Sequence, residues 1–383
     1  MNNKIRVLMM TNGFNQGTGG GIAAFCNNYF QAIDKKQFEF DFLTIAYQAF
    51  EIYRESIEAQ GGNLACLGVT SFKGIKGKIS YMRAFKEYLK QNSYDIIHIN
   101  MGSFFTVFLC SLVAKKYGRG AKVIAHSHSN LIYTGINKIA VRLAKPFFPK
   151  VADYFLACST PAGKYMFPNK VLLSDRYGIM KNAIDISNFL YDENQRLKLR
   201  QELGLRDEIV IGHVGRFSVA KNHLFLVNVF DALVRIHKNS KLLLVGAGEL
   251  QDKVREMVND LGLEQKVIFT GLRNDVFRYL QVMDVFVLPS LFEGLSVVAI
   301  EAQASGLPLV ASDNMPPETG VTELYSQVSL EKSPAYWAEH ILKRISLYER
   351  INRLQDIKDA GYDIYSEAKK LGDLYSKLSK ENF

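Results

Sequence analysis

Cysteine is scarce in this chain of 383 residues, and its four cysteines lie far apart with no C-x-x-C pair. That spacing fits neither a zinc site nor a disulfide framework, so we expect four buried, reduced thiols. Long apolar runs are also lacking, because the longest, 103–114, has 12 residues and a membrane span needs about 20. The N-terminal segment has no basic region followed by a signal-type apolar stretch. We therefore expect a protein that stays in the cytoplasm.

The remaining composition is that of a packed protein, with 48% hydrophobic and 22% charged residues, which excludes a disordered or fibrous chain. At roughly 100 to 200 residues per domain, the length predicts two or three cores, most simply two. Short apolar runs alternate with helix-length amphipathic stretches, so the fold class is α/β with two doubly wound halves. The expected strands lie at 5–10, 38–44, 95–100, 122–126 and 154–157, and then at 209–214, 241–245, 266–270, 285–288 and 309–311.

The connection between the halves is expected in the polar segment 177–192, which has no sustained periodicity. Ligands of such sheets bind beyond the carboxyl ends of the strands. Two facing sheets would therefore place a cleft between the domains.

The charge of the chain is concentrated in its first half. Residues 1–185 hold 23 Lys and Arg against 11 Asp and Glu, which gives +12, whereas residues 186–383 hold 24 against 27, which gives −3. Residues 73–150 alone carry 14 basic residues and two acidic ones, again +12. A polyanionic surface is one partner for such a segment, and ordinary solvation of exposed helix faces is the alternative.

A glycine-rich segment follows the first expected strand, and residues 22–33 then form an expected helix. Backbone N–H groups of such a loop can hold a phosphate at the helix N-terminus. After Gly17 and Gly19, Ile22 stands where the dinucleotide fingerprint needs Gly or Ala, so a classical NAD site is disfavoured. A purely steric role for these glycines is the alternative.

Two further segments carry charged side chains at strand ends. Arg216 and Lys221 stand five positions apart, where a planar guanidinium and a compact ammonium suit a diphosphate. Glu293 and Glu301 stand eight apart, the first in a glycine turn and the second in an apolar helix. A carboxylate on such a helix should be hydrogen-bonded, for which sugar and ribose hydroxyls are suitable donors. The alternative is a carboxylate near a helix dipole at Glu293 and a solvent-facing Glu301.

At these residues the chain resembles the retaining glycosyltransferases of family four. Segment 293–308 resembles the family's E-x7-E motif, Gly215-Arg216-Phe217 with Lys221 its basic loop, Asn182-Ala183-Ile184-Asp185 a mild variant of its N-G-[IV]-D connector, and Gly246-Ala247-Gly248 its V-G-x-G turn. Pro316-Pro317-Glu318 and His126-Ser127-His128 further resemble the branch that builds bacterial capsular polysaccharide or exopolysaccharide. The motifs follow in the family's order over most of the chain.

The resemblance implies two Rossmann-like domains in the GT-B arrangement, facing across a cleft. Residues 1–185 would bind the acceptor, residues 186–363 would bind the donor, and the final helix in 364–383 would pack back on the first domain. Arg216 and Lys221 would hold the diphosphate, Glu301 the ribose hydroxyls, and Glu293 the donor sugar beside the backbone of Gly294 and Leu295. Gly20 and Gly21 would close over the phosphates. His126 would lie near the acceptor and the transferred sugar, unless it is only a hydrogen-bonded structural residue.

The family transfers sugars with retention, and no motif here places an obvious carboxylate as a covalent nucleophile, which favours front-face displacement. The sequence has no D-x-D triplet and no His/Cys cluster, so no obligatory metal or other cofactor is expected. The expected donor is a UDP-sugar, and the expected acceptor is a saccharide linked to undecaprenyl diphosphate. One alternative is a nucleotide-sugar hydrolase or epimerase of the GT-B fold. Another is a non-catalytic polyanion or nucleic-acid binder, which would leave the paired glutamates unexplained.

The basic residues of the first half also predict a membrane surface as a partner. Two stretches, 73–90 and 132–150, are rich in Lys and Arg, and the second mixes them with apolar residues at helical spacing. An ordinary core-facing stripe is the alternative. A lipid-linked acceptor would hold this domain at the inner leaflet, where each basic residue near anionic lipid adds roughly 1 kcal/mol of attraction. We therefore expect a peripheral protein on the inner face of the cell membrane.

Overall fold

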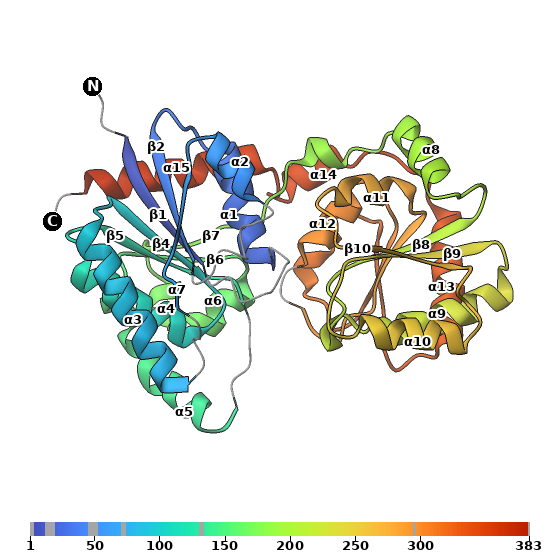
Figure 1. The fold of residues 1–383 in the computed structure, drawn as a ribbon, viewed down its shortest axis with the longest axis horizontal. Helices are drawn as coiled ribbons and strands as arrows, with labels where there is room; N and C mark the ends of the chain where they lie inside the picture. The colour runs from blue at the N-terminus through green and yellow to red at the C-terminus, as the bar shows by residue number, and fades with distance from the viewer. Residues whose placement is uncertain are drawn as a thin grey trace. The chain divides into compact units, whose positions relative to one another are not determined.

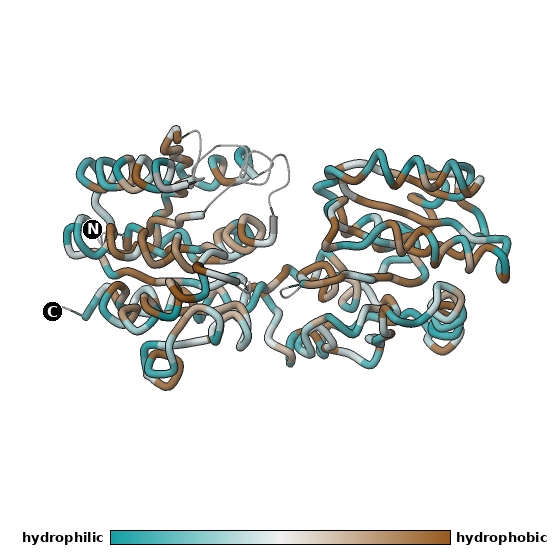
Figure 2. The backbone as a smooth tube through the Cα atoms, turned by 90° about the horizontal axis from the view of Figure 1, so that it is seen from below, coloured by the Kyte–Doolittle hydropathy of each residue, from teal (hydrophilic) through white to brown (hydrophobic). Residues whose placement is uncertain are grey.

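The computed structural model describes residues 4–11, 20–44, 53–69, 74–129, 134–293 and 296–381. The chain divides into two compact units, Met1–Ala183 with Ile364–Phe383, and Ile184–Asp363. Each unit, taken by itself, has a parallel sheet with helices on its two faces (Figure 1). Hydrophobic strand segments lie between helices of mixed hydropathy in both (Figure 2). The predicted α/β class with two doubly wound halves is confirmed.

The first unit contains seven parallel strands in the order β3-β2-β1-β4-β5-β6-β7. They are β1 (Ile5–Thr11), β2 (Phe38–Thr44), β3 (Asn63–Cys66), β4 (Ile96–Met101), β5 (Lys122–Ser127), β6 (Tyr154–Ala157) and β7 (Tyr177–Ile179). Every residue of β4 and β5 is buried, because both faces of a central parallel strand are covered. Chain order reverses between β1 and β4, and open α/β sheets bind their ligands at such a switch point.

The helices of this unit include one that comes from the far end of the chain. In chain order they are α1 (Gly20–Ala32), α2 (Arg54–Ala59), α3 (Gly74–Gln91), α4 (Phe104–Tyr117), α5 (Gly135–Ala144), η3 (Lys145–Lys150), α6 (Thr160–Met166), α7 (Asn169–Leu172) and α15 (Ile364–Lys380). The side chains of Ala368, Leu371 and Tyr375 on α15 are fully buried, at the spacing of one helix face. They join the core beside α1, so the last helix completes the first unit.

The second unit contains six parallel strands in the order β10-β9-β8-β11-β12-β13. They are β8 (Ile209–Val214), β9 (Ser240–Val245), β10 (Val267–Gly271), β11 (Val285–Leu288), β12 (Leu309–Ser312) and β13 (Tyr325–Val328). The helices are η4 (Ile186–Phe189), α8 (Glu193–Glu202), η5 (Val219–Lys221), α9 (His223–Ile236), α10 (Gln251–Asp260), α11 (Val276–Val282), α12 (Val297–Ala304), η6 (Pro317–Thr319), α13 (Pro334–Leu347) and α14 (Leu354–Asp359). Chain order reverses between β8 and β11, which marks the second switch point.

Three strands were not predicted, namely β3, β7 and β13, and each lies at the edge of its sheet. These three edge strands are short, partly exposed and without an apolar run, whereas the predicted edge strand β10 keeps one in Val267-Ile268-Phe269. β7 lies within 177–192, where we expected no regular structure. The expectation of four buried thiols is wrong for Cys66, which is half-buried at the end of edge strand β3, whereas the other three are buried. No helix of the described residues is both long enough and apolar enough to span a bilayer.

Candidate active site

The loops that follow β8 and β11 are joined to each other at the switch point of the second sheet. β8 and β11 are neighbours in that sheet. The N–H of Leu291 donates to the carbonyl of Ala220 (2.8 Å), and Asn222 Nδ2 donates to the carbonyl of Pro289 (3.2 Å). Asn222 has a left-handed φ of 56° and separates η5 from α9. These contacts fix the position of Lys221, the last residue of η5.

Lys221 and Glu293 meet across these two loops. Lys221 Nζ forms an ion pair with Glu293 Oε1, and only 16% and 15% of the two side chains remain exposed. Ser290 Oγ donates to the same carboxylate oxygen (3.0 Å). Because both side chains are largely removed from water, salt and solvent screen this pair less than a surface ion pair. The structure thus brings together one predicted cation and one predicted carboxylate.

Glycines allow the backbone after β9 to approach the loop after β8. Gly246 has φ 138°, and a Cβ there would collide with the carbonyl oxygen of Gly215. A Cβ on Gly248 would lie 2.5 Å from the carbonyl oxygen of Phe217. The N–H of Phe217 donates to the carbonyl of Ala247 (3.1 Å). The predicted Gly246-Ala247-Gly248 turn therefore supports the loop that carries Arg216 and Lys221.

Arg216 makes its ion pair with a different carboxylate. Its Nε donates to Glu249 Oε2 (3.0 Å), and 42% and 53% of the two side chains are exposed. Exposed pairs of this kind contribute little to stability. Breaking the ion pair with Glu249 to admit an incoming anion would therefore cost little free energy.

Glu301 lies in the middle of α12, whose only other polar side chain is the buried Gln303. Its side chain is half-buried, and its carboxylate has no hydrogen-bond or ion-pair partner among the described residues. Burial raises the pKa of Glu301 to about 7. A desolvated, unpaired carboxylate is stabilised by any ligand that supplies hydroxyl donors.

In the first unit, His126 belongs to a buried row of hydrogen-bonded side chains. His126 Nδ1 lies 3.1 Å from His98 Nε2, and His98 Nδ1 lies 2.7 Å from the hydroxyl of Tyr375 on α15. His126 Nε2 is buried and has no partner among the described residues. The His128 ring lies 4.0 Å from the His126 ring, and His128 Nε2 bonds to Asn100 Oδ1 (3.1 Å). Burial lowers the pKa of His98 to about 3 and that of His126 well below its ordinary value, so both rings are neutral.

Gly20 and Gly21 are the first residues of α1 and follow the switch-point strand β1. A Cβ added at Gly21 would meet no described atom within 4 Å. No described residue therefore fills the space beside Gly21. The preceding residues 12–19, and Gly294 and Leu295 of the predicted donor site, lie outside the described residues.

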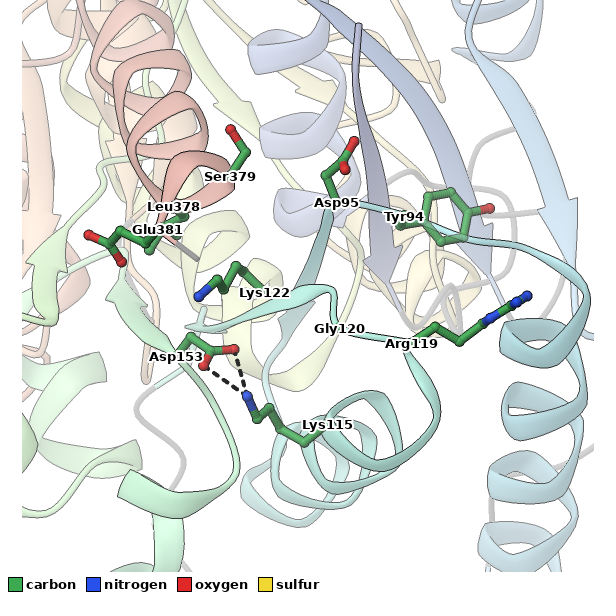
Figure 3. A pocket seen from close by; sticks show the side chains of 10 residues that line it. All are labelled: Tyr94, Asp95, Lys115, Arg119, Gly120, Lys122, Asp153, Leu378, Ser379 and Glu381. Atoms are coloured by element: carbon green, nitrogen blue, oxygen red, sulfur yellow. Dashed lines mark hydrogen bonds and ion pairs between the residues drawn. The ribbon is translucent and has the colours of Figure 1, made fainter. Parts of the chain in front are cut away.

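A separate cavity of about 450 Å³ lies near the amino ends of β4 and β5. It is therefore on the side of the first sheet opposite the carboxyl ends of the strands, where His126 lies. Figure 3 shows its charged lining, in which Lys115 bonds to both carboxylate oxygens of Asp153 at 2.9 and 3.1 Å. None of the residues singled out by the motifs lines it. Within the described ranges, no three His, Cys, Asp or Glu side chains are grouped so that they could hold a metal ion.

Four residues that contact the predicted site residues were not predicted from the sequence, namely Ser290, Glu249, His98 and Tyr375. A signal was available for His98, because a histidine at the centre of the apolar strand Ile96–Met101 must find a polar partner when it is buried. No local pattern marks Glu249 or Tyr375, whose partners lie far away in the sequence.

Comparisons with known proteins agree with this architecture. Residues 19–188 match the family described as Glycosyltransferase Family 4, and residues 208–346 match Glycosyl transferases group 1. The chain is 30% identical to glycosyltransferase EpsF of Bacillus subtilis over 344 residues, which cover 88% of this chain and 87% of that protein. It is 26% identical to the capsular polysaccharide biosynthesis glycosyltransferase CapH of Staphylococcus aureus over 322 residues, 82% of this chain and 85% of CapH.

The chain is also similar to an enzyme whose name states its acceptor and to a protein of known structure. An Escherichia coli UDP-Gal:alpha-D-GlcNAc-diphosphoundecaprenol alpha-1,3-galactosyltransferase is 26% identical over 256 residues, 65% of this chain and 64% of that enzyme. The crystal structure of Anabaena HepE in complex with UDP and glucose matches with a TM-score of 0.76 at 18% identity, over 97% of this chain and 99% of HepE. Both Rossmann-like units of the expected GT-B fold are thereby confirmed. Since the similarity to EpsF extends over nearly the whole length of both proteins, this chain belongs to the family-four glycosyltransferases.

Proposed function

We propose that the chain transfers a sugar, with retention of configuration, from a nucleotide-diphosphate donor to a saccharide acceptor in bacterial polysaccharide biosynthesis. The observation that carries this proposal is the Lys221–Glu293 pair at the switch point of the second sheet. A sugar diphosphate offers an anion to the ammonium and hydroxyl donors to the carboxylate. A UDP-sugar is the proposed donor, in keeping with the UDP and glucose bound to HepE.

In this proposal Lys221 and Arg216 hold the diphosphate, and Glu301 accepts hydrogen bonds from the ribose hydroxyls. Glu293 accepts from the donor sugar, beside the backbone of Gly294 and Leu295. The unpartnered carboxylate of Glu301 supports its role, because hydroxyl donors would satisfy a group that the described residues leave unpaired.

Gly20 and Gly21 would leave room for the phosphates, and His126 would face the acceptor and the transferred sugar. Gly20 and Gly21 follow the switch-point strand β1, and His126 lies near the carboxyl end of β5, which adjoins the switch-point strand β4.

The proposed chemistry is a front-face displacement. The bond between the sugar C1 and the diphosphate oxygen breaks, and a bond from C1 to the acceptor oxygen forms on the same face. The acceptor hydroxyl proton passes to the departing diphosphate. Negative charge grows on that diphosphate in the transition state, where Lys221 and Arg216 stabilise it. We propose that these cations make the reaction independent of a metal ion.

The proposed acceptor is a saccharide linked to undecaprenyl diphosphate, the kind of acceptor named for the Escherichia coli relative. The exposure of helix α5 supports the proposal that the acceptor is membrane-bound. The helix lies at the margin of the first unit (Figure 1), and none of its residues is buried. An apolar stripe along α5 and η3 is exposed, at 80% for Ile136, 60% for Ile139, 68% for Leu143 and 55% for Phe147.

The core-facing alternative holds for Phe148, which is fully buried, but these four apolar side chains do not face the core. The packed face of α5 is formed instead by Val141 and Ala144, which contact the core of the unit. Lys138 and Arg142 are exposed beside the apolar stripe. An exposed apolar stripe flanked by cations suits the interface of an anionic bilayer. We therefore propose a peripheral position on the inner face of the cell membrane.

A thermal-shift screen with UDP-, GDP- and dTDP-sugars tests the donor, because a ligand that binds only the native state raises the melting temperature. Formation of a product with the stabilising donor and a lipid-linked saccharide then tests transfer. Donor consumption without any dependence on acceptor would instead indicate a nucleotide-sugar hydrolase or epimerase. Stabilisation by none of these donors would contradict the proposal.

A further inference from the structure

The hydroxyl of Tyr375 connects the last helix of the chain to His126 through His98. Tyr375 lies on α15, His98 on β4 and His126 on β5, and all three side chains are fully buried. The contacts of 2.7 and 3.1 Å make a continuous row of hydrogen bonds from Tyr375 to His126. The row ends at His126 Nε2, the one ring nitrogen of this pair of histidines that has no partner among the described residues.

The direction of these hydrogen bonds follows from the number of available protons. Each neutral imidazole carries one N–H, and Tyr375 carries one O–H. If Tyr375 donates to His98 Nδ1, then His98 Nε2–H donates to His126 Nδ1, and only the His126 Nε2–H lacks a described partner. If the direction is reversed, both the hydroxyl hydrogen of Tyr375 and the lone pair of His126 Nε2 lack one. Because each unsatisfied buried group costs free energy, the first direction is favoured.

We propose that Tyr375 and His98 are positioning residues that hold His126 in the tautomer with its proton on Nε2. His126 is then a hydrogen-bond donor toward an oxygen of the bound sugar or acceptor, and it does not act as the base. The identity of that ligand rests on the proposed function, whereas the tautomer does not. A hydrogen-bond donor at His126 Nε2 is consistent with the proposed transfer of the acceptor proton to the departing diphosphate, because His126 then has no need to take up that proton.

Long-range ¹H–¹⁵N spectra of the full chain labelled with ¹⁵N-histidine test this assignment directly. His98→Gln and His126→Gln identify the two sets of signals among the seven histidines. We expect a protonated Nε2 and an unprotonated Nδ1 on both rings in the unsubstituted protein. Tyr375→Phe should convert both rings to a mixture of tautomers. A proton on Nδ1 of His126 in the unsubstituted protein would overturn the proposal, and this measurement needs no substitution at Tyr375.

Tyr29→Phe is the matched control. Tyr29 is buried in the same core, and its hydroxyl donates to the carbonyl of Lys181 (2.6 Å) outside the histidine row. We expect this variant to leave both tautomers unchanged and to stay within about twofold of full turnover. Tyr375→Phe should lower turnover about tenfold, the effect of about one hydrogen bond, with the KM for the donor unchanged. Unchanged tautomers or unchanged turnover in Tyr375→Phe would overturn its positioning role.

The two proposals can fail separately. Absence of sugar transfer with every donor would overturn the proposed function, while the tautomers of His98 and His126 would still decide the positioning role.

Discussion

Lys221 and Glu293 form an ion pair between the loops that follow two neighbouring strands, β8 and β11. Ser290 holds the carboxylate from its own loop, and the N–H of Leu291 ties the two loops together through the carbonyl of Ala220. The ammonium is therefore held in place by protein contacts. In the proposed function a donor diphosphate that approaches Lys221 would share this ammonium with Glu293, so we expect Lys221 and Glu293 substitutions to have different effects on donor binding and turnover.

Lys221→Ala should lower turnover at saturating donor as well as donor affinity. In the proposed mechanism negative charge grows on the diphosphate as the sugar departs, and loss of such a stabilising contact typically costs ~10²-fold or more in rate. Steady-state kinetics with varied donor measures both quantities. Lys253→Ala, at an exposed position on α10, is the matched control and should change neither. Weaker donor binding with unchanged turnover would limit Lys221 to ground-state recognition.

Glu293→Ala should leave the fold intact and reduce sugar transfer severely. The substituted carboxylate lies in a loop, so its loss removes the contact to Lys221 without opening the buried core. Circular dichroism and a transfer assay on the purified variant measure the two effects. Near-normal transfer in a folded variant would exclude Glu293 from the site.

The pKa of Glu301 predicts how the affinity for the nucleotide depends on pH. Burial raises this pKa from 4.5 to about 7, so the native state binds more protons than the unfolded chain between these values. The stability of the ligand-free protein should therefore fall as the pH rises through this window. In the proposed site the nucleotide hydroxyls donate to the ionised carboxylate, so UDP affinity should fall about tenfold from pH 8 to pH 6. Calorimetric titration measures this dependence.

Glu301→Gln is the control for this prediction. It should weaken UDP binding at pH 8 and flatten the pH dependence, because the amide does not titrate in this range. An unchanged slope between pH 6 and pH 8 in Glu301→Gln would assign the dependence to another group.

Gly21→Ala should preserve stability and weaken donor binding. The added methyl group meets no described atom within 4 Å, and alanine in a helix is favoured over glycine by up to about 1 kcal/mol. We expect an equal or higher melting temperature and a KM for the donor raised about tenfold. Gly248→Ala provides the contrast, because its methyl group would press against the backbone of Phe217 and should lower the melting temperature. An unchanged KM in Gly21→Ala would place the phosphates elsewhere.

The protein should bind vesicles that contain anionic lipid through helix α5, and this binding should weaken as the salt concentration rises. Reversing Lys138 and Arg142 to Glu, together with Lys76 on α3, should abolish the salt-dependent part of binding. Replacing Ile139 and Leu143 by Ser should remove the part that persists at high salt, because these side chains are exposed by 60% and 68%. Co-sedimentation with vesicles measures both parts.

Two other lysines of the first basic stretch are less suitable for reversal. The Lys78 and Lys86 ammonium groups lie 5.2 Å and 5.0 Å from the ring centres of Phe105 and Tyr117 on α4, so their substitution would also disturb helix packing. Three exposed lysines of the second unit, Lys253, Lys343 and Lys358, make a matched control for the change in net charge. Binding that is indifferent to the reversals on α5 and α3 would contradict electrostatic attachment.

The sequence by itself determined the α/β class, the ten strands with strong apolar runs, and the family. These features can be recognised in short stretches of sequence. Central parallel strands are buried on both faces and so are continuous apolar runs, and the residues of each motif lie at a fixed spacing along the chain. Glu293 and Glu301, eight positions apart, were recognisable for that reason. The edge strands β3, β7 and β13 were not, because partial exposure removes the apolar signal.

Only the tertiary structure decided which side chains meet. Lys221 pairs with Glu293 because β8 and β11 are neighbours in the sheet, and Arg216 pairs with Glu249 because β9 adjoins β8 on its other side. Tyr375 reaches His98 because α15, which follows the whole second unit in the sequence, packs on the first unit. Such pairings depend on strand order and helix docking. These bring together residues that are far apart in the sequence, so the local sequence around one residue does not predict its partner.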